Sequence, residues 1–124
     1  MSQKTRSIIG WILTGLLAAL FIFSVIGKFK GGPEMEKGMA AMGLTMDTMH
    51  MLGVVELLSI LLFIIPRTGV LGTLLLTAYL GGAIATHLEH AQPIIMPAIV
   101  EAVLWITAVI RFPELARRLM GATI

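Results

Sequence analysis

Two acidic residues lie inside stretches of the sequence that are otherwise almost entirely apolar. Glu56 interrupts residues 49–65, and Glu101 interrupts residues 91–110. A charged side chain at the centre of a bilayer costs at least about 2.5–3.5 kcal/mol on insertion scales. Such a carboxylate is therefore protonated, paired with a cation or open to a water-filled pocket. The first expectation for both residues is a functional site.

Polar residues of the neighbouring apolar segments lie at a similar depth if each segment forms a helix. At a rise of about 1.5 Å per residue, Glu56, Glu101 and Tyr79 all lie on the order of 10 Å below the same surface. A small set of converging polar groups in apolar surroundings is typical of a site for a lipophilic ligand. The candidate ligand-binding residues are Ser24, Lys28, Glu56, Tyr79, His87, Glu101 and Trp105.

The same residues also have a purely structural interpretation. Glu56 would pair with Lys28 and hold the first helix to the second, and Glu101 would pair with a histidine. The two interpretations are compatible, because a structural pair can also line a pocket. Trp105, four residues after Glu101, either stacks on a ligand or fills the core.

The histidines raise the question of a metal. His87 and His90 are three residues apart and share a helix face, so together with Glu101 they would suit zinc or iron. His50 and His87 would serve as the two axial ligands of a haem if they lay on facing helices at one depth. Interfacial histidines are common without a metal. We therefore predict no metal site and keep His50, His87 and His90 as the alternative.

A row of methionines precedes the second apolar segment. The spacing is four, three, four and three residues, followed by one further methionine: Met35, Met39, Met42, Met46, Met49 and Met51. Thioethers suit Cu(I), but this spacing also lays side chains on one face of a helix. We predict an amphipathic helix over residues 34–44 at the outer membrane interface, with its methionine side on lipid or on the helix bundle.

The composition excludes several classes of protein. Of 124 residues, 57% are hydrophobic and 13% are charged, whereas a soluble domain has about 25% charged residues. The absence of cysteine excludes disulfides, thiol redox centres and Cys-ligated metals. The net charge of +2 includes no dense basic run, so we expect no nucleic-acid partner. No glycine-rich dinucleotide motif is present.

Four apolar segments are each close to the roughly 20 residues that cross a bilayer as a helix. We place the spans at residues 8–27, 48–65, 68–87 and 93–111, within one domain of residues 1–124. The first segment is longer than the apolar part of a signal peptide, so we expect it to be retained. The predicted fold is an all-α integral membrane four-helix bundle, with the amphipathic helix in the outer loop between the first two spans.

Orientation follows from the Lys and Arg of the short loops. One side of the membrane receives Lys4, Arg6, Arg67, Arg111, Arg117 and Arg118, and the other receives Lys28, Lys30 and Lys37. We therefore predict a multi-pass protein of a bacterial inner membrane, with both termini in the cytoplasm.

An ordered set of short motifs resembles the DoxX-like family of small four-helix membrane proteins. The motifs are "FSVIGKF", "AMGL", "GVVELL", "IPRTGVLGTLLLTAYLGGAIATHLEH" and "MPAIVEAVLW". Carried over from the family, Lys28, Glu56 and His87 would form its polar core, whereas the Met-rich loop and Glu101 are not family signatures. The broader group is named for a membrane subunit associated with thiosulfate:quinone oxidoreduction, and other relatives are linked to oxidative stress. The resemblance thus implies a quinone ligand.

These observations and the resemblance lead to one functional hypothesis. The protein would bind a lipophilic molecule such as a quinone in an outward-facing polar pocket, as an accessory or subunit of a redox or oxidative-stress system, and would not be an enzyme by itself. Lys28 and His87 would hydrogen-bond a carbonyl oxygen, and Glu56 or Glu101 would relay a proton. The alternatives are a proton-coupled exporter of small solutes and a structural partner of another membrane protein. Expected partners are the bilayer, a second copy or a membrane redox protein.

Overall fold

The computed structural model describes residues 2–121, which form helices and no β-strand. The prediction of an all-α chain is confirmed over this range. The elements are α1 (Gln3–Lys30), α2 (Pro33–Ala41), α3 (Met46–Ile64), the 3-10 helix η1 (Pro66–Thr68), α4 (Gly69–Glu89), α5 (Ile95–Arg111) and α6 (Pro113–Leu119).

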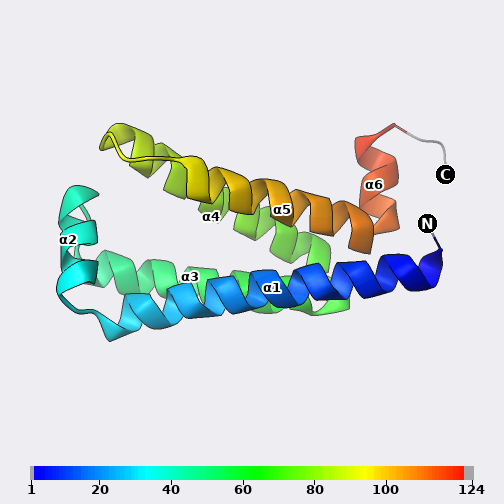
Figure 1. Cartoon of the computed structure of the whole chain (residues 1–124), viewed down its shortest axis with the longest axis horizontal. Coiled ribbons are helices and arrows are strands. Elements are labelled where there is room, and N and C mark those ends of the chain that lie inside the picture. Colours follow the sequence, from blue (N-terminus) through cyan, green and yellow to red (C-terminus); the bar gives the residue numbers. More distant parts are fainter. Residues whose placement is uncertain (1, 122–124) are drawn as a thin grey trace.

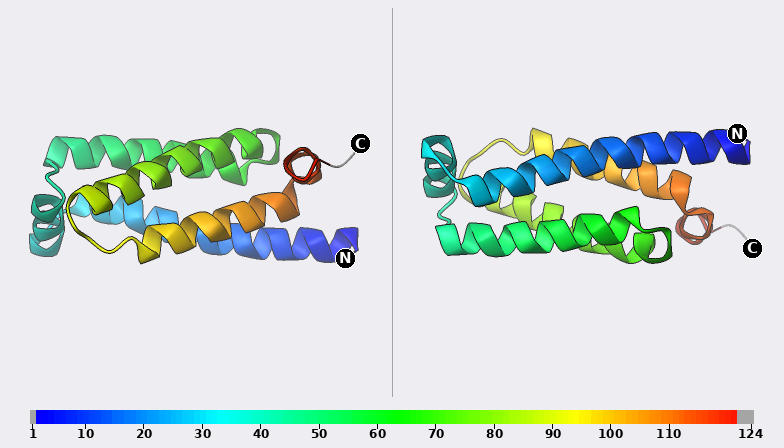
Figure 2. Two further views of the ribbon diagram at one scale, coloured as in Figure 1. Left: turned by 90° about the horizontal axis from the view of Figure 1, so that it is seen from above. Right: turned by 90° about the horizontal axis from the view of Figure 1, so that it is seen from below.

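Four long helices run lengthwise beside one another (Figures 1 and 2). Helix α1 packs against α3 and α5, and α4 packs against the same two helices. Each long helix therefore has two neighbours, and the core lies between all four. The core side chains are Leu17, Phe21, Ile60, Phe63, Leu76, Leu80, Val100, Leu104, Ala108 and Phe112.

Local sequence signals set the ends of the helices. The side chains of Ser2 and Thr45 cap α1 and α3, each accepting a hydrogen bond from the backbone N–H three residues later, at 3.2 Å. Pro33 and Pro113 occupy the first positions of α2 and α6, where a missing N–H costs nothing. Pro113 also forces Phe112 into an extended conformation, so that α6 leaves α5 at 111°.

The buried hydroxyls of the core donate within their own helices. The hydroxyls of Thr14, Ser59, Thr73 and Thr107 each donate to the carbonyl oxygen four residues earlier, at 2.7–2.8 Å. These residues are buried, and their local bonds remove the cost of burying an unpaired hydroxyl.

The outer faces of the long helices are apolar. Large exposed hydrophobic side chains occur along all four helices, among them Leu16, Phe23, Leu58, Leu74, Ile99 and Ile106. Among residues 2–121, three helical segments are long and apolar enough to cross a membrane: Gln3–Lys30, Met46–Ile64 and Pro66–Glu89. The bent pair α5 and α6 passes the same test only when taken together. Together these surfaces indicate a membrane protein.

The two ends of the molecule differ in what they carry. The start of α1, η1 and α6 lie at one end, called the termini end below, and α2 and the α4–α5 connection lie at the opposite end, called the α2 end (Figure 1). Six of the nine Lys and Arg fall at the termini end, beside one acidic residue, Glu114. The α2 end carries four of the seven acidic residues: Glu34, Glu36, Asp47 and Glu89.

The methionine row does not lie on one continuous helix. Helix α2 ends at Ala41, and Gly43, with a φ of 67°, turns the chain before α3 begins at Met46. The interruption arises because this left-handed conformation ends a helix and suits glycine. Helix α2 lies across the α2 end of the molecule (Figure 1).

The methionines of α2 face the rest of the protein. Met35 and Met39 are half-buried, while Glu34 and Glu36 are exposed. The terminal methyl of Met35 lies 3.8 Å from the point where a Cβ of Gly27 would be, so it contacts the last turns of α1. That contact favours the packing interpretation of the row over a metal site.

Candidate functional site

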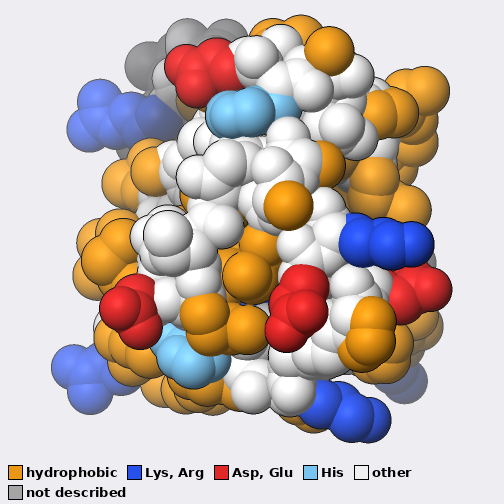
Figure 3. Space-filling model, turned by 90° about the vertical axis from the view of Figure 1, so that its left-hand side faces the viewer, with side chains coloured by type: hydrophobic (Ala, Val, Ile, Leu, Met, Phe, Trp, Pro, Cys, Tyr) orange, Lys and Arg blue, Asp and Glu red, His pale blue; other side chains and the backbone are white. Residues whose placement is uncertain are grey.

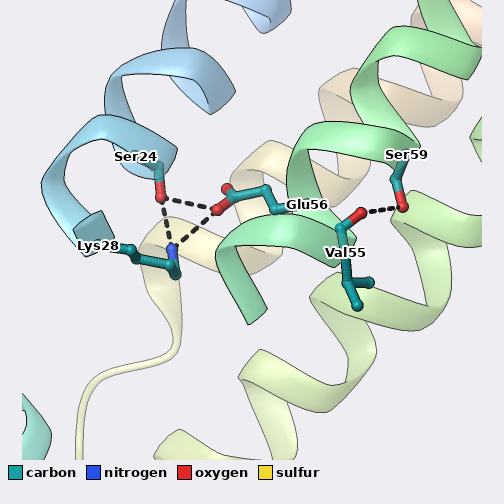
Figure 4. A network of polar contacts seen from close by, with 5 residues as sticks. All are labelled: Ser24, Lys28, Val55, Glu56 and Ser59. Atoms are coloured by element: carbon teal, nitrogen blue, oxygen red, sulfur yellow. Dashed lines mark hydrogen bonds and ion pairs between the residues drawn. The ribbon is translucent and has the colours of Figure 1, made fainter. Parts of the chain in front are cut away.

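A buried ion pair joins α1 to α3 near the α2 end. The Lys28 Nζ lies 2.9 Å from Oε1 of Glu56, and the two side chains are 12% and 2% exposed. The Ser24 hydroxyl accepts a hydrogen bond from the Lys28 ammonium at 2.7 Å and donates to the same Glu56 oxygen at 3.3 Å. Figure 4 shows the three side chains converging between the two helices. The predicted pairing of Lys28 with Glu56 is confirmed.

Sequence spacing and a close helix contact position these groups. Ser24 and Lys28 are four residues apart and therefore share one face of α1. On α3, Gly53 lies one turn before Glu56, and a Cβ there would lie 2.7 Å from the ring of Phe29. The missing side chain at Gly53 lets α1 approach α3 at this level, which brings the ammonium within reach of the carboxylate.

Tyr79, from a third helix, lies beside the pair. Its ring is half-buried on α4, and its centroid lies 5.7 Å from the Lys28 Nζ. That distance is within the range of a cation–π contact. The candidate site thus combines Ser24, Lys28, Glu56 and Tyr79, contributed by α1, α3 and α4.

The Lys28 ammonium has one N–H group beyond the two bonded to Ser24 and Glu56, and the Tyr79 side chain lies beside it. Lys28 is also the more exposed member of the pair. The arrangement is therefore able to offer one charged donor to an acceptor oxygen that approaches from outside the pair.

Glu101 forms no bond with this cluster. Within residues 2–121, Glu101 forms no ion pair or hydrogen bond, and it is half-buried on α5. The histidine expected as its structural partner does not pair with it, because His87 and His90 bond to their own helix. Trp105 is half-buried one turn further along α5. A ligand-binding role for Glu101 and Trp105 stays a prediction.

The histidines are held by local contacts. Nδ1 of His87 lies 2.6 Å from the carbonyl oxygen of Ala83, and Nδ1 of His90 lies 2.9 Å from that of Thr86. The ring of His50 stacks on Phe29, with centroids 5.1 Å apart. Within the described chain, no group of three His, Asp or Glu residues is placed to hold a metal ion.

Figure 3 looks onto the α2 end of the molecule. Acidic and histidine side chains are scattered over this face among apolar and uncharged groups, and Lys and Arg side chains lie toward its edges. His90 lies against Gly43, because a Cβ added to Gly43 would lie only 2.9 Å from Nε2 of His90. The α4–α5 connection therefore touches the turn between α2 and α3.

A second polar cluster at the termini end was missed from the sequence. The guanidinium of Arg111 donates to the carbonyl oxygens of Phe63 and Ile64 at 2.7 and 3.1 Å and to the Thr14 hydroxyl at 3.3 Å. Arg6 donates to the carbonyl oxygens of Val109 and Ile110. The sequence alone predicts both arginines only as loop charges. The signal was present, since the last carbonyls of α3 and α5 need donors.

A cavity of about 340 Å³ opens beside these arginines. Its lining includes Gln3, Arg6, Ser7, Trp11, Arg111 and Glu114. The cavity lies at the opposite end of the molecule from the Lys28–Glu56 pair, where no pocket was expected.

Comparison with known proteins gives one match. The model of the DoxX-like family matches residues 12–109, which include Ser24, Lys28, Glu56, Tyr79, His87, Glu101 and Trp105. No curated protein matches the chain. No solved structure matches it either.

Proposed function

Because the chain belongs to the DoxX-like family, we propose that it is a multi-pass membrane protein that binds the polar head of a lipophilic molecule at Lys28 and Glu56. The proposed ligand class is a quinone or another lipid with an acceptor oxygen. In this proposal the protein is an accessory or subunit of a membrane redox system and does not carry out the redox step itself. In the proposal the spans are α1, α3, α4 and α5, at about residues 8–27, 48–65, 68–87 and 93–111, arranged as a four-helix bundle, and α6 turns away after the last span.

The observation that carries the proposal is the charged, partly exposed Lys28 donor beside Tyr79. Two of the three ammonium N–H groups are bonded inside the protein, and the side chain is 12% exposed. A carbonyl oxygen of a quinone accepts such a charged hydrogen bond well, because the surrounding membrane offers no competing water. The Tyr79 ring, 5.7 Å from the Lys28 Nζ, adds an aromatic surface beside the same donor.

The cost of the pair supports a role beyond holding helices together. A buried ion pair is often no more stabilising than apolar side chains of similar volume, because both charges lose their hydration. Two apolar residues at positions 28 and 56 would also hold α1 to α3. Retaining the charges at this depth therefore favours a function that needs them.

The charge distribution supports an orientation. The termini end carries six of the nine Lys and Arg, and short loops rich in these residues stay in the cytoplasm. In the proposal, the termini end faces the cytoplasm of a bacterial cell, and the Lys28–Glu56 site opens toward the other side. Helix α2, with its half-buried methionines and exposed glutamates, would lie as an amphipathic helix at that outer interface.

The test is to identify what the purified protein carries. The wild-type chain and two variants, Lys28→Met and Glu56→Gln, are purified in mild detergent, and their bound lipids are extracted and analysed by mass spectrometry. Lys30→Met is the matched control, because it removes the same charge two residues away on an exposed part of α1. We expect a quinone or related lipid in the wild type and the control, and its loss in both site variants.

A purely structural function of the ion pair gives a different result. The double variant Lys28→Met/Glu56→Leu keeps α1 and α3 together through apolar contacts and has no charge to bind a ligand. If it remains folded and still binds decylubiquinone in a titration as the wild type does, the binding function is wrong. The ion pair would then serve only the assembly of the helices or of a complex with another membrane protein.

A further inference from the structure

The cavity at the termini end carries an excess of positive charge. It lies where the start of α1 meets the bend between α5 and α6, and it has a volume of about 340 Å³. Arg6 and Arg111 line it against a single acidic residue, Glu114. Gln3 and Ser7 add uncharged hydrogen-bonding side chains. This combination of groups suits an anion with several acceptor oxygens.

The two arginines are held in place by the backbone, which leaves donors for a ligand. Arg6 bonds to the carbonyl oxygens of Val109 and Ile110 at 3.2 and 2.7 Å through two of its five N–H groups. Arg111, the next residue along, uses three of its own for Phe63, Ile64 and Thr14. Both arginines line the cavity, and their hydrogen bonds hold both guanidinium groups in place before any anion binds, which lowers the entropy lost on binding.

The surroundings of the cavity place it at the level of lipid headgroups. Trp11 lines the cavity, and the centroid of its ring lies 4.6 Å from the guanidinium carbon of Arg111. Tryptophan is enriched at the boundary between lipid and water. Ile8 and Ile12 on the outer face of α1 are exposed. An apolar chain that leaves the cavity therefore meets an apolar surface.

We propose that this cavity binds the phosphate of an anionic phospholipid from the adjacent leaflet. The arginines hold the phosphate oxygens, Ser7 and Gln3 bond the remaining headgroup, and the acyl chains lie along α1 beside Trp11. Arg117 and Arg118 on α6 are exposed at the same end and add to the attraction for an anionic membrane surface. This site depends on the membrane embedding of the protein, and it is independent of the ligand site at Lys28.

The test compares two phospholipids that differ in charge. The full chain in detergent is titrated with phosphatidylglycerol and with phosphatidylcholine of the same acyl chains, and bound lipid is counted by native mass spectrometry. Phosphatidylglycerol should bind preferentially. Arg6→Gln should weaken its binding about tenfold, because a charge-assisted hydrogen bond is lost. Arg118→Gln, with the same change in charge on the exposed part of α6, should change it less than about twofold.

A second variant separates loss of the site from loss of the fold. Ser7→Trp fills the cavity at an exposed position and leaves both arginines and their backbone bonds unchanged. It should abolish the preference for phosphatidylglycerol without lowering the melting temperature. Glu114→Gln should raise phosphatidylglycerol affinity, because it removes the only acidic side chain of the cavity lining.

Three results would overturn the proposal: equal binding of the two lipids, equal effects of Arg6→Gln and Arg118→Gln, or undiminished binding in Ser7→Trp. Inorganic phosphate distinguishes the source of the phosphate group, and millimolar phosphate without lipid should leave the melting temperature unchanged. Stabilisation by phosphate alone would assign the cavity to a soluble anion instead. Lys28→Met should not affect phosphatidylglycerol binding, so this site is tested separately from the quinone site.

Discussion

The Arg111 guanidinium donates to the carbonyl oxygen of Phe63 at 2.7 Å, so a side chain from the last turn of α5 caps the last turn of α3. The same guanidinium lies 4.9 Å from the centroid of the Phe63 ring. Residue 63 thus contacts Arg111 through both its backbone and its side chain. The final carbonyls of α3 have no partner within their own helix, and an arginine from another helix supplies one.

This relationship predicts a large effect at position 111. Arg111→Met should lower the free energy of unfolding by roughly 3 kcal/mol, because it leaves the carbonyls of Phe63 and Ile64 unpaired and removes the stacking contacts. Arg117→Met, an exposed arginine on α6, should change it by less than about 0.5 kcal/mol. Denaturant unfolding in detergent followed by circular dichroism measures both, and equal effects would contradict the capping role.

A pair of glycines on α4 gives a sharper test of helix packing. A Cβ at Gly72 would overlap the backbone nitrogen of Phe63, whereas a Cβ at Gly81 would meet nothing within 4 Å. Gly72→Ala should therefore force α3 and α4 apart and destabilise the protein by roughly 2–3 kcal/mol. Gly81→Ala should be neutral or stabilising by up to about 1 kcal/mol, because alanine restricts the unfolded chain. The melting temperature should fall in Gly72→Ala and should equal or exceed that of the wild type in Gly81→Ala.

The ion pair predicts energetic coupling between two positions. Lys28→Met or Glu56→Gln alone should destabilise the protein by roughly 3 kcal/mol, because each leaves a buried group without its partner. The double variant Lys28→Met/Glu56→Leu should be more stable than the sum of the single changes implies. Additive effects would mean that the two residues contribute independently, despite the 2.9 Å contact.

Much of the helix content was predictable from the sequence, for a physical reason. Long uncharged segments cannot leave their backbone groups unpaired in lipid, so hydropathy alone indicates helices there. The starts of α1, α2, α3 and α6 carry capping residues or prolines that are readable directly. The break at Gly43 was harder, because the methionine period continues across it and only a single glycine interrupts the pattern.

The Lys28–Glu56 pair was predictable because a buried carboxylate in an apolar helix needs a partner at its own depth. Depth follows from counting residues along a helix, but the direction in which each helix presents its side chains does not. Glu101 lies at a depth that suits the same site, yet it forms no bond to the pair among residues 2–121. Its position around α5 depends on the packing of α5 against α1 and α4, which one sequence does not reveal.

The arginine cluster and its cavity could not be predicted from the sequence, for a related reason. Arg6 and Arg111 are 105 positions apart in the chain, and each lies at the edge of an apolar segment, where arginine is common. Their roles depend on the 111° bend at Phe112 and on the start of α1 lying beside the end of α5. The residue pattern of one segment does not indicate which distant segment it will pack against.

The proposed orientation predicts which end of the molecule a reagent reaches from outside the cell. The chain has no cysteine, so a single introduced thiol reports one position without a background signal. Ala40→Cys on α2 and Met120→Cys after α6 are both exposed positions at opposite ends of the molecule. A membrane-impermeant maleimide should label Ala40→Cys in intact cells, and Met120→Cys only after the membrane is permeabilised.

The reverse pattern would show that the termini end faces outward, against the surplus of Lys and Arg there. Equal labelling of both thiols in intact cells would mean that the protein inserts in both orientations. In that case the charge difference between the two ends would be too small to fix one of them.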